Sequence, residues 1–161
     1  MKKIMESPCT VSDGMQVSEV ELVYKSKVKA SERPQVKSSK EVYELLLKSW
    51  DENKIEFVEQ FKILLLNRAN KVLGIYEIST GGLVGTVADL KVIFIAALKV
   101  AASHIILAHN HPSGNIKPSH ADKELTGKIK EGGKLLEIDV VDHLIISPEG
   151  YYSFADEGIL Y

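Results

Sequence analysis

Three absences limit the classes of protein to which this chain of 161 residues can belong. It has a single cysteine, Cys9, which excludes a small domain held together by intrachain disulfides. Its most apolar window, residues 92–100, contains Lys99 and is far shorter than the about 20 residues that a membrane-spanning helix needs. The first residues lack the apolar run of a secretory signal. We therefore expect a cytoplasmic protein that does not enter a membrane.

The chain also lacks a strong net charge and a compositional bias. Twenty Lys and Arg residues against 22 Asp and Glu residues give a formal net charge of −2, so bulk electrostatics does not favour binding to a phosphate backbone. Hydrophobic residues make up 45% and charged residues 26%, which excludes a disordered chain. This length fits one domain. We expect a weakly ordered lead-in over residues 1–18 and one domain over residues 19–161.

Apolar periodicity predicts an α/β domain, in which helices pack against a sheet. The expected strands lie near residues 19–29, 61–66, 72–78, 105–108, 140–147 and 151–154. The expected helices lie near residues 39–50, 87–101 and 119–133, and their candidate N-terminal caps are Ser38, Thr86 or Asp89, and Ser119. The hairpin of residues 61–78 and the last two strands are joined by residues typical of turns.

One stretch departs from the balanced charge. Six Lys or Arg residues and a single Glu lie between Lys25 and Lys40. Such a cluster is compatible with a nucleic-acid footprint. The alternative is an exposed strand whose lysines prevent its edge from pairing with other chains. We expect weak nucleic-acid binding or none.

Histidines cluster in a short part of the chain, since four of the five lie within seventeen residues: His104, His109, His111 and His120. Residues i and i+2 of an extended chain project to the same side, so His109 and His111 should aim both imidazoles at one point, with Asn110 turned aside. Asp122 can add an oxygen ligand. Three protein ligands and one open position are typical of catalytic zinc. The alternatives are that Ser119 and Asp122 only cap a helix, and that the histidines belong to a polar loop.

A hydrolytic metal site also needs a proton carrier. A carboxylate beside a metal-bound water can take its proton during attack and return it to the leaving group. The chain has fifteen Glu residues, and periodicity leaves Glu56, Glu59 and Glu77 as open candidates. Each of these, taken alone, is more often a solvated surface residue.

Several motifs together resemble a known family. One segment resembles the JAMM signature of the JAB/MPN metalloprotease fold. It consists of His109-Asn110-His111-Pro112-Ser113-Gly114, followed by Pro118-Ser119 and Asp122. The Asn-His-Pro-Ser-Gly form is similar to the RadC family of bacterial proteins. The likeness extends over about residues 19–160 and includes the motifs Lys29-Ala30-Ser31-Glu32-Arg33-Pro34, Glu59-Gln60-Phe61 and Asp142-His143.

The resemblance implies a JAB/MPN (cytidine-deaminase-like) fold, a mixed sheet flanked by helices. It implies a Zn²⁺ site built by His109, His111 and Asp122, with Glu59 as general acid/base and Ser119 assisting the oxyanion. The implied activity is zinc-dependent hydrolysis of a peptide or isopeptide amide bond in a protein or peptide substrate. The residues without an assigned role are His104, His120, Asp142 and His143, which we expect to be structural or supporting residues.

Two other functions remain open at this point. The basic stretch and the family's association with DNA repair suggest a DNA-repair-associated or DNA-binding accessory protein. Many members of the family carry a helix-hairpin-helix segment, whose glycine hairpins this chain does not show. A non-catalytic scaffold of the same fold is the second alternative, and the intact set of three converging ligands argues against it. The oligomeric state is not predicted.

Overall fold

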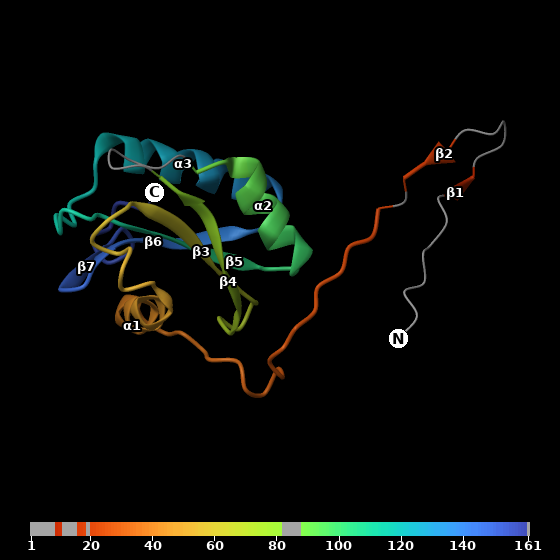
Figure 1. The fold of residues 1–161 in the computed structure, drawn as a ribbon, viewed down its shortest axis with the longest axis horizontal. Helices are drawn as coiled ribbons and strands as arrows, with labels where there is room; N and C mark the ends of the chain where they lie inside the picture. Colours follow the sequence, from red (N-terminus) through yellow and green to blue (C-terminus); the bar gives the residue numbers. More distant parts are fainter. Residues whose placement is uncertain (1–8, 11–15, 19, 82–87, 161) are drawn as a thin grey trace.

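A five-stranded sheet separates one helix from two others in the computed structural model, which describes residues 9–10, 16–18, 20–81 and 88–160 (Figure 1). The helices are α1 (Ser39–Ser49), α2 (Leu90–Lys99) and α3 (His120–Leu135). The strands of this sheet are β3 (Gln60–Leu66), β4 (Val72–Thr80), β5 (His104–Asn110), β6 (Asp139–Ser147) and β7 (Gly150–Ser153). Two short strands, β1 (Cys9–Thr10) and β2 (Gln16–Val17), form a separate antiparallel pair.

The five-stranded sheet is mixed, with the strand order β4-β3-β5-β6-β7. Strands β5 and β6 run parallel, and the other neighbouring pairs are antiparallel. A parallel pair needs a crossover connection, and α3 provides it between the end of β5 and the start of β6. The α/β fold expected from the sequence, a mixed sheet flanked by helices, is confirmed.

Strand β3 is buried on both faces because its apolar residues serve two cores. Phe61, Ile63 and Leu65 pack with residues of α2 and α3, on what we call the α3 face of the sheet. Leu64 and Leu66 pack with residues of α1, on what we call the α1 face. The uninterrupted apolar run of this strand therefore reflects its central place between two helical layers.

Most predicted elements form close to their expected bounds. Ser38, Asp89 and Ser119 each accept a hydrogen bond from a backbone N–H in the first turn of their helix, so the structure confirms these three caps. The alternative cap Thr86 lies outside the described residues. Strand β5 continues through Asn110, two residues beyond the predicted end. In the described part of the chain, no helix combines the length and the apolar character needed to cross a membrane.

The strand predicted near residues 19–29 does not form in the described residues 20–29. Its alternating residues are exposed, and the segment runs away from the sheet (Figure 1). The segment touches the edge strand β4 through a side chain, because the Tyr24 hydroxyl donates to the Leu73 carbonyl at 2.8 Å. A strand needs a backbone partner, and the alternation alone does not supply one. The explanation of the lysines as protection of a strand edge therefore fails.

Candidate metal centre

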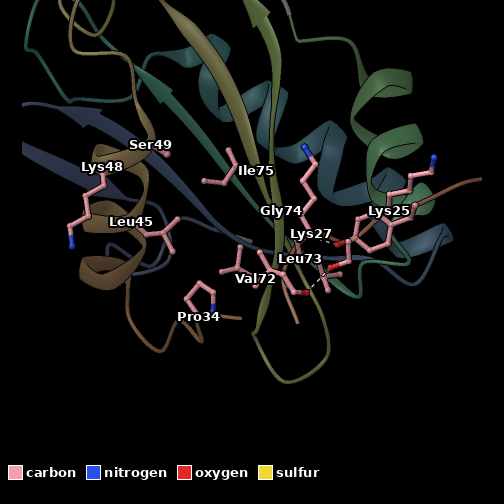
Figure 2. Close-up of a pocket in the computed structure, with 13 residues that line it drawn as sticks. Lys25, Lys27, Pro34, Leu45, Lys48, Ser49, Val72, Leu73, Gly74 and Ile75 are labelled. Atoms are coloured by element: carbon pink, nitrogen blue, oxygen red, sulfur yellow. Dashed lines mark hydrogen bonds between the residues drawn. The ribbon is translucent and has the colours of Figure 1, made fainter. Parts of the chain in front are cut away.

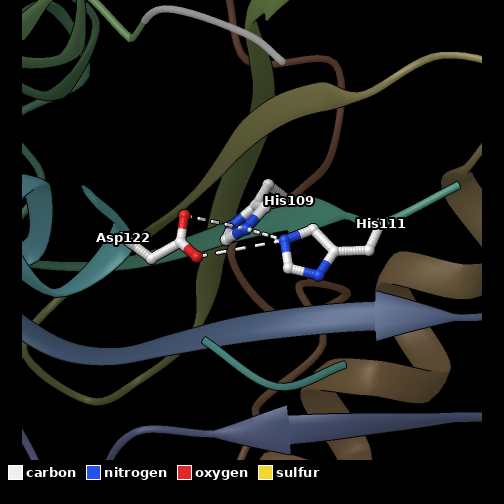
Figure 3. Close-up of side chains that lie close together, drawn as sticks. All are labelled: His109, His111 and Asp122. Atoms are coloured by element: carbon white, nitrogen blue, oxygen red, sulfur yellow. Dashed lines mark hydrogen bonds and ion pairs between the residues drawn. The ribbon is translucent and has the colours of Figure 1, made fainter. Parts of the chain in front are cut away.

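Three side chains of the ligand type converge at the carboxyl end of β5. His109 is the penultimate residue of β5, and His111 follows the end of the strand. Asp122 lies in the first turn of α3. Figure 3 shows the three side chains pointing toward one another. The Nε2 atoms of His109 and His111 are 3.0 Å apart, and Asp122 Oδ1 lies 3.3 Å from His109 Nε2. One ligand atom of each residue lies within 4.8 Å of the others, a spacing that fits a single ion.

The loop between β5 and α3 orients His111. Gly114 has a φ of 75°, a left-handed conformation that favours glycine, and its N–H donates to the His111 carbonyl at 2.9 Å. This turn brings the Asn115 carbonyl oxygen to 2.5 Å from His111 Nδ1. A carbonyl oxygen only accepts, so Nδ1 carries the proton. The Nε2 lone pair of His111 then faces the centre, which is the form of imidazole that binds metals.

The first turn of α3 orients Asp122. Its Oδ2 accepts hydrogen bonds from the backbone N–H and the hydroxyl of Ser119, both at 2.6 Å, while its own N–H donates to Ser119 Oγ at 3.1 Å. Burial raises the pKa of Asp122, but the contact with His109 and the hydrogen bonds from Ser119 outweigh burial and hold this pKa well below its ordinary value. Asp122 is therefore ionised at neutral pH, as a metal ligand must be.

The donor atoms of the cluster need a proton or a metal ion between them. The Asp122 carboxylate presents only lone pairs, and His111 Nε2 presents another. Facing lone pairs repel each other, so the distances of 3.0 Å between His109 and His111 and of 3.3 Å between His109 and Asp122 require a proton or a metal ion between the atoms. Two imidazole nitrogens and one carboxylate are a donor set that suits zinc. The residues present therefore fit a divalent metal ion.

Asn110 projects to the α1 face, opposite to the two histidines that flank it, as the alternation predicts. Its Oδ1 accepts from the Gln60 N–H at 2.7 Å. Its Nδ2 donates to the carbonyls of Ile55 and Val58 at 2.7 and 2.9 Å. The side chain is fully buried. Asn110 thus attaches the segment before β3 to the strand that carries His109.

Glu59 lies at the end of that segment, immediately before β3, and is half-buried. Phe61 pairs with His109 in the β3–β5 ladder. When the alternation of β3 is carried back by two residues, Glu59 falls on the same α3 face as His109. The group of mutually close ligand atoms does not include Glu59. A position on the face of His109, outside the ligand group, is compatible with the predicted proton carrier.

The other two glutamate candidates lie elsewhere. Glu56 is exposed. Glu77 pairs with Lys62 at 3.7 Å, and the Lys62 ammonium lies over the ring of Trp50, which ends α1. Glu77 therefore belongs to the α1 face. The hydrogen bond from the Thr80 hydroxyl, more than any other contact, lowers the pKa of Glu77.

His143 is a neighbour of the centre to which the sequence assigns no role. It is fully buried, with Nε2 2.8 Å from His109 Nδ1 and Nδ1 2.6 Å from Thr126 Oγ1. Burial, more than the charges around it, lowers the pKa of His143 well below its usual value. In the sequence, the indication that His143 matters was the dipeptide Asp142-His143, which is one of the motifs that resemble the family. Its contact with His109 depends on the parallel pairing of β5 and β6.

The remaining unassigned residues lie away from the centre. His104, at the opposite end of β5, contacts Asn70 Oδ1 through Nδ1 at 2.8 Å. The side chain of His120 is 88% exposed. Asp142 is buried and accepts hydrogen bonds from the Ser153 hydroxyl and the Ala155 N–H. These three residues therefore do not extend the ligand set.

A separate groove lies between the segment around Tyr24, α1 and β4 (Figure 2). Its volume is about 510 Å³. Leu45, Val72 and Ile75 contribute apolar walls, and Lys25 and Lys27 lie at its border. None of the three candidate ligands lines this groove. The candidate metal centre is therefore independent of it.

Comparison with known protein families identifies the fold, and the matched range includes the three candidate ligands. A family model described as "RadC-like JAB domain" matches residues 36–159. A UPF0758 protein of Flavobacterium johnsoniae is 48% identical over 101 residues, which cover 63% of this chain and 44% of the relative. A UPF0758 protein of Alkaliphilus metalliredigens is 39% identical over 125 residues, 78% of this chain and 53% of the relative. The chain spans about half the length of the curated relatives it matches.

Proposed function

The chain belongs to the family of RadC-like JAB domain proteins, and we propose that it is a zinc-dependent hydrolase. The observation that carries the proposal is the convergence of His109, His111 and Asp122, whose ligand atoms lie within 4.8 Å of one another. Structural zinc sites usually have four protein ligands, whereas catalytic sites have three and keep one position for water or substrate. The three-residue set therefore favours catalysis over a structural role.

The proposed reaction is hydrolysis of a peptide or isopeptide amide bond. Zinc bound at this centre would supply Lewis acidity and lower the pKa of a bound water to about 7. Glu59 takes the proton of the attacking water and returns it to the leaving nitrogen. Its place on the α3 face, two residues before the partner of His109, supports this assignment.

Ser119 is proposed to stabilise the oxyanion of the tetrahedral intermediate. In the structure its hydroxyl donates to Asp122 Oδ2 at 2.6 Å. Assisting the oxyanion therefore requires the hydroxyl to exchange this acceptor for the substrate oxygen. The backbone N–H of Ser119 also donates to Oδ2, so Asp122 keeps one of its two bonds from Ser119 during that exchange.

Metal analysis tests the first half of the proposal. Protein purified without chelators or a metal-binding tag should carry about one zinc ion per chain, measured by elemental mass spectrometry. The double variant His109→Ala/His111→Ala should lose this zinc but keep its fold, because a domain of this size has a sufficient core without a metal. His104→Ala is the matched control, since His104 lies at the other end of β5. Full zinc retention in the double variant would contradict the ligand assignment.

A substrate screen tests the second half. The zinc-loaded protein should hydrolyse at least one member of a panel of peptides and isopeptide-linked conjugates, and the double variant should hydrolyse none. The His104→Ala control should match the parent. Zinc occupancy without hydrolysis of any amide in the panel would contradict the hydrolase and leave the metal centre standing.

A further inference from the structure

A chain of three hydrogen bonds connects the backbone of α3 to the imidazole of His109. The Thr126 hydroxyl is 2.6 Å from the Asp122 carbonyl oxygen. Thr126 Oγ1 is also 2.6 Å from His143 Nδ1, and His143 Nε2 is 2.8 Å from His109 Nδ1. The three side chains that these bonds connect, those of Thr126, His143 and His109, are at most 4% exposed. Bulk water therefore does not compete for these bonds.

The direction of each bond follows from the first acceptor. A backbone carbonyl only accepts, so the Thr126 hydroxyl hydrogen points to Asp122, and Thr126 Oγ1 accepts from His143 Nδ1–H. A second proton on His143 Nε2 would create a fully buried cation whose two nitrogens face a hydroxyl and another imidazole, neither of which carries negative charge. His143 Nε2 therefore accepts, and His109 donates from Nδ1.

We propose that Thr126 and His143 are positioning residues, which hold the proton of His109 on Nδ1 and thereby keep its Nε2 lone pair available to a metal ion. This inference rests on the metal-binding role proposed above. The Asn115 carbonyl fixes His111 in the same tautomer. Both imidazoles then offer Nε2 to the same point, where a metal ion replaces the proton that the metal-free cluster holds.

The placement of Thr126 links two requirements of the centre. Thr126 lies four residues after Asp122 on α3, so its hydroxyl reaches the Asp122 carbonyl in the preceding turn. One helix turn therefore carries the carboxylate ligand and also sets the tautomer of the first histidine ligand. Valine in place of Thr126 would fill the same space but remove the acceptor for His143 Nδ1–H. His143 could then move its proton to Nε2, which would drive the His109 proton to the metal-binding nitrogen.

The test compares Thr126→Val with Thr126→Ser, which keeps the hydroxyl. Long-range ¹H–¹⁵N correlation spectra of the metal-free protein show which ring nitrogen of each histidine carries the proton. We expect Nδ1–H on His109 and His143 in the parent and in Thr126→Ser, and a shift toward Nε2–H on both in Thr126→Val. Zinc affinity, measured by competition with a chromophoric chelator, should fall about 10- to 100-fold in Thr126→Val and stay within about threefold in Thr126→Ser.

Unchanged tautomers and unchanged zinc affinity in Thr126→Val would overturn the inference. A parent protein that keeps both protons on Nδ1 but binds no zinc would instead overturn the metal centre, so the two failures are distinguishable. If Thr126→Val does not fold, the zinc affinities of His143→Gln and His143→Leu test the same inference. The glutamine oxygen can accept from His109 Nδ1–H and should preserve zinc affinity better than leucine, and equal affinities of these two variants would overturn the inference.

Discussion

The ring of Phe61 lies nearly parallel to the imidazole of His109, with the ring centroids 5.9 Å apart and an angle of 8° between the planes. The two residues are also partners in the β3–β5 ladder. Phe61 is 2% exposed and covers the side of His109 that faces β3. Shielding from water strengthens electrostatic interactions at the centre. The same pairing sets the position of Glu59 relative to the ligands.

Glu59→Gln should separate metal binding from catalysis. Glutamine keeps the shape of the side chain but cannot take a proton, so zinc occupancy should remain near that of the parent while hydrolysis falls about 10²- to 10⁴-fold or more. Glu56→Gln and Glu77→Gln are the matched controls, since one residue is exposed and the other belongs to the α1 face. Turnover at the parent rate in Glu59→Gln would exclude Glu59 as the proton carrier.

Asn110→Ala should lower the free energy of unfolding by at least about 2 kcal/mol. The substitution removes the side-chain partner of three backbone groups: the buried N–H of Gln60, the buried carbonyl of Ile55 and the part-buried carbonyl of Val58. Urea unfolding measures the effect, with the exposed Asn53→Ala as control, which should change stability by less than about 0.5 kcal/mol. Equal stability of the two variants would show that the bonds of Asn110 do not hold the segment before β3.

Asp142→Asn should change how stability depends on pH. Burial raises the pKa of Asp142, although hydrogen bonds from Ser153, Ala155 and the His143 N–H lower it in part. Between the unfolded-state pKa of about 3.9 and the higher native pKa, the native state binds more protons than the unfolded state, so stability falls as pH rises. The slope of this contribution is at most about 1.4 kcal/mol per pH unit.

Urea unfolding of both proteins, with a chelator present, checks this dependence from about pH 4 to about pH 7. The variant should gain stability relative to the parent as pH rises through that window. A constant difference between the two proteins over the whole range would mean that the pKa of Asp142 is the same in the folded and unfolded states.

Weak nucleic-acid binding or none is expected from the basic stretch, although the structure leaves its lysines exposed. A dissociation constant above about 1 µM at physiological salt should be measured for duplex and single-stranded DNA. The triple variant Lys25→Gln/Lys27→Gln/Lys29→Gln should behave like the parent. Tighter binding that weakens steeply with salt and disappears in the triple variant would favour the DNA-binding alternative.

Local patterns predicted much of the candidate site, because its geometry depends on short separations in sequence. The i, i+2 rule brought His109 and His111 to one point, and the helix start at Ser119 placed Asp122 within reach. Contacts between distant segments could not be predicted in this way. His143 meets His109 only because β6 runs parallel to β5, and Glu77 is assigned to the α1 face only by the register of β3 with β4.

The strand predicted near residues 19–29 is a case in which a local pattern predicted an element that does not form. Alternation in Val20, Leu22 and Tyr24 is typical of a half-buried strand, but the pattern does not state which backbone would pair with it. The described segment contacts β4 through the Tyr24 hydroxyl instead of a ladder. Its apolar residues Val20 and Leu22 consequently remain 84% and 82% exposed.

The capping box of α3 has a dynamic consequence, because the carboxylate of Asp122 serves both the helix end and the ligand cluster. Opening of the first helical turn breaks the bonds to Ser119 and withdraws Asp122 from the two histidines. A metal ion that binds only when the first turn of α3 is formed therefore lowers the population of the opened turn, and the effect grows with the affinity of the ion. Deuterium uptake at the backbone amides of Asp122 and Lys123 then reports occupancy of the centre, without any substrate being known.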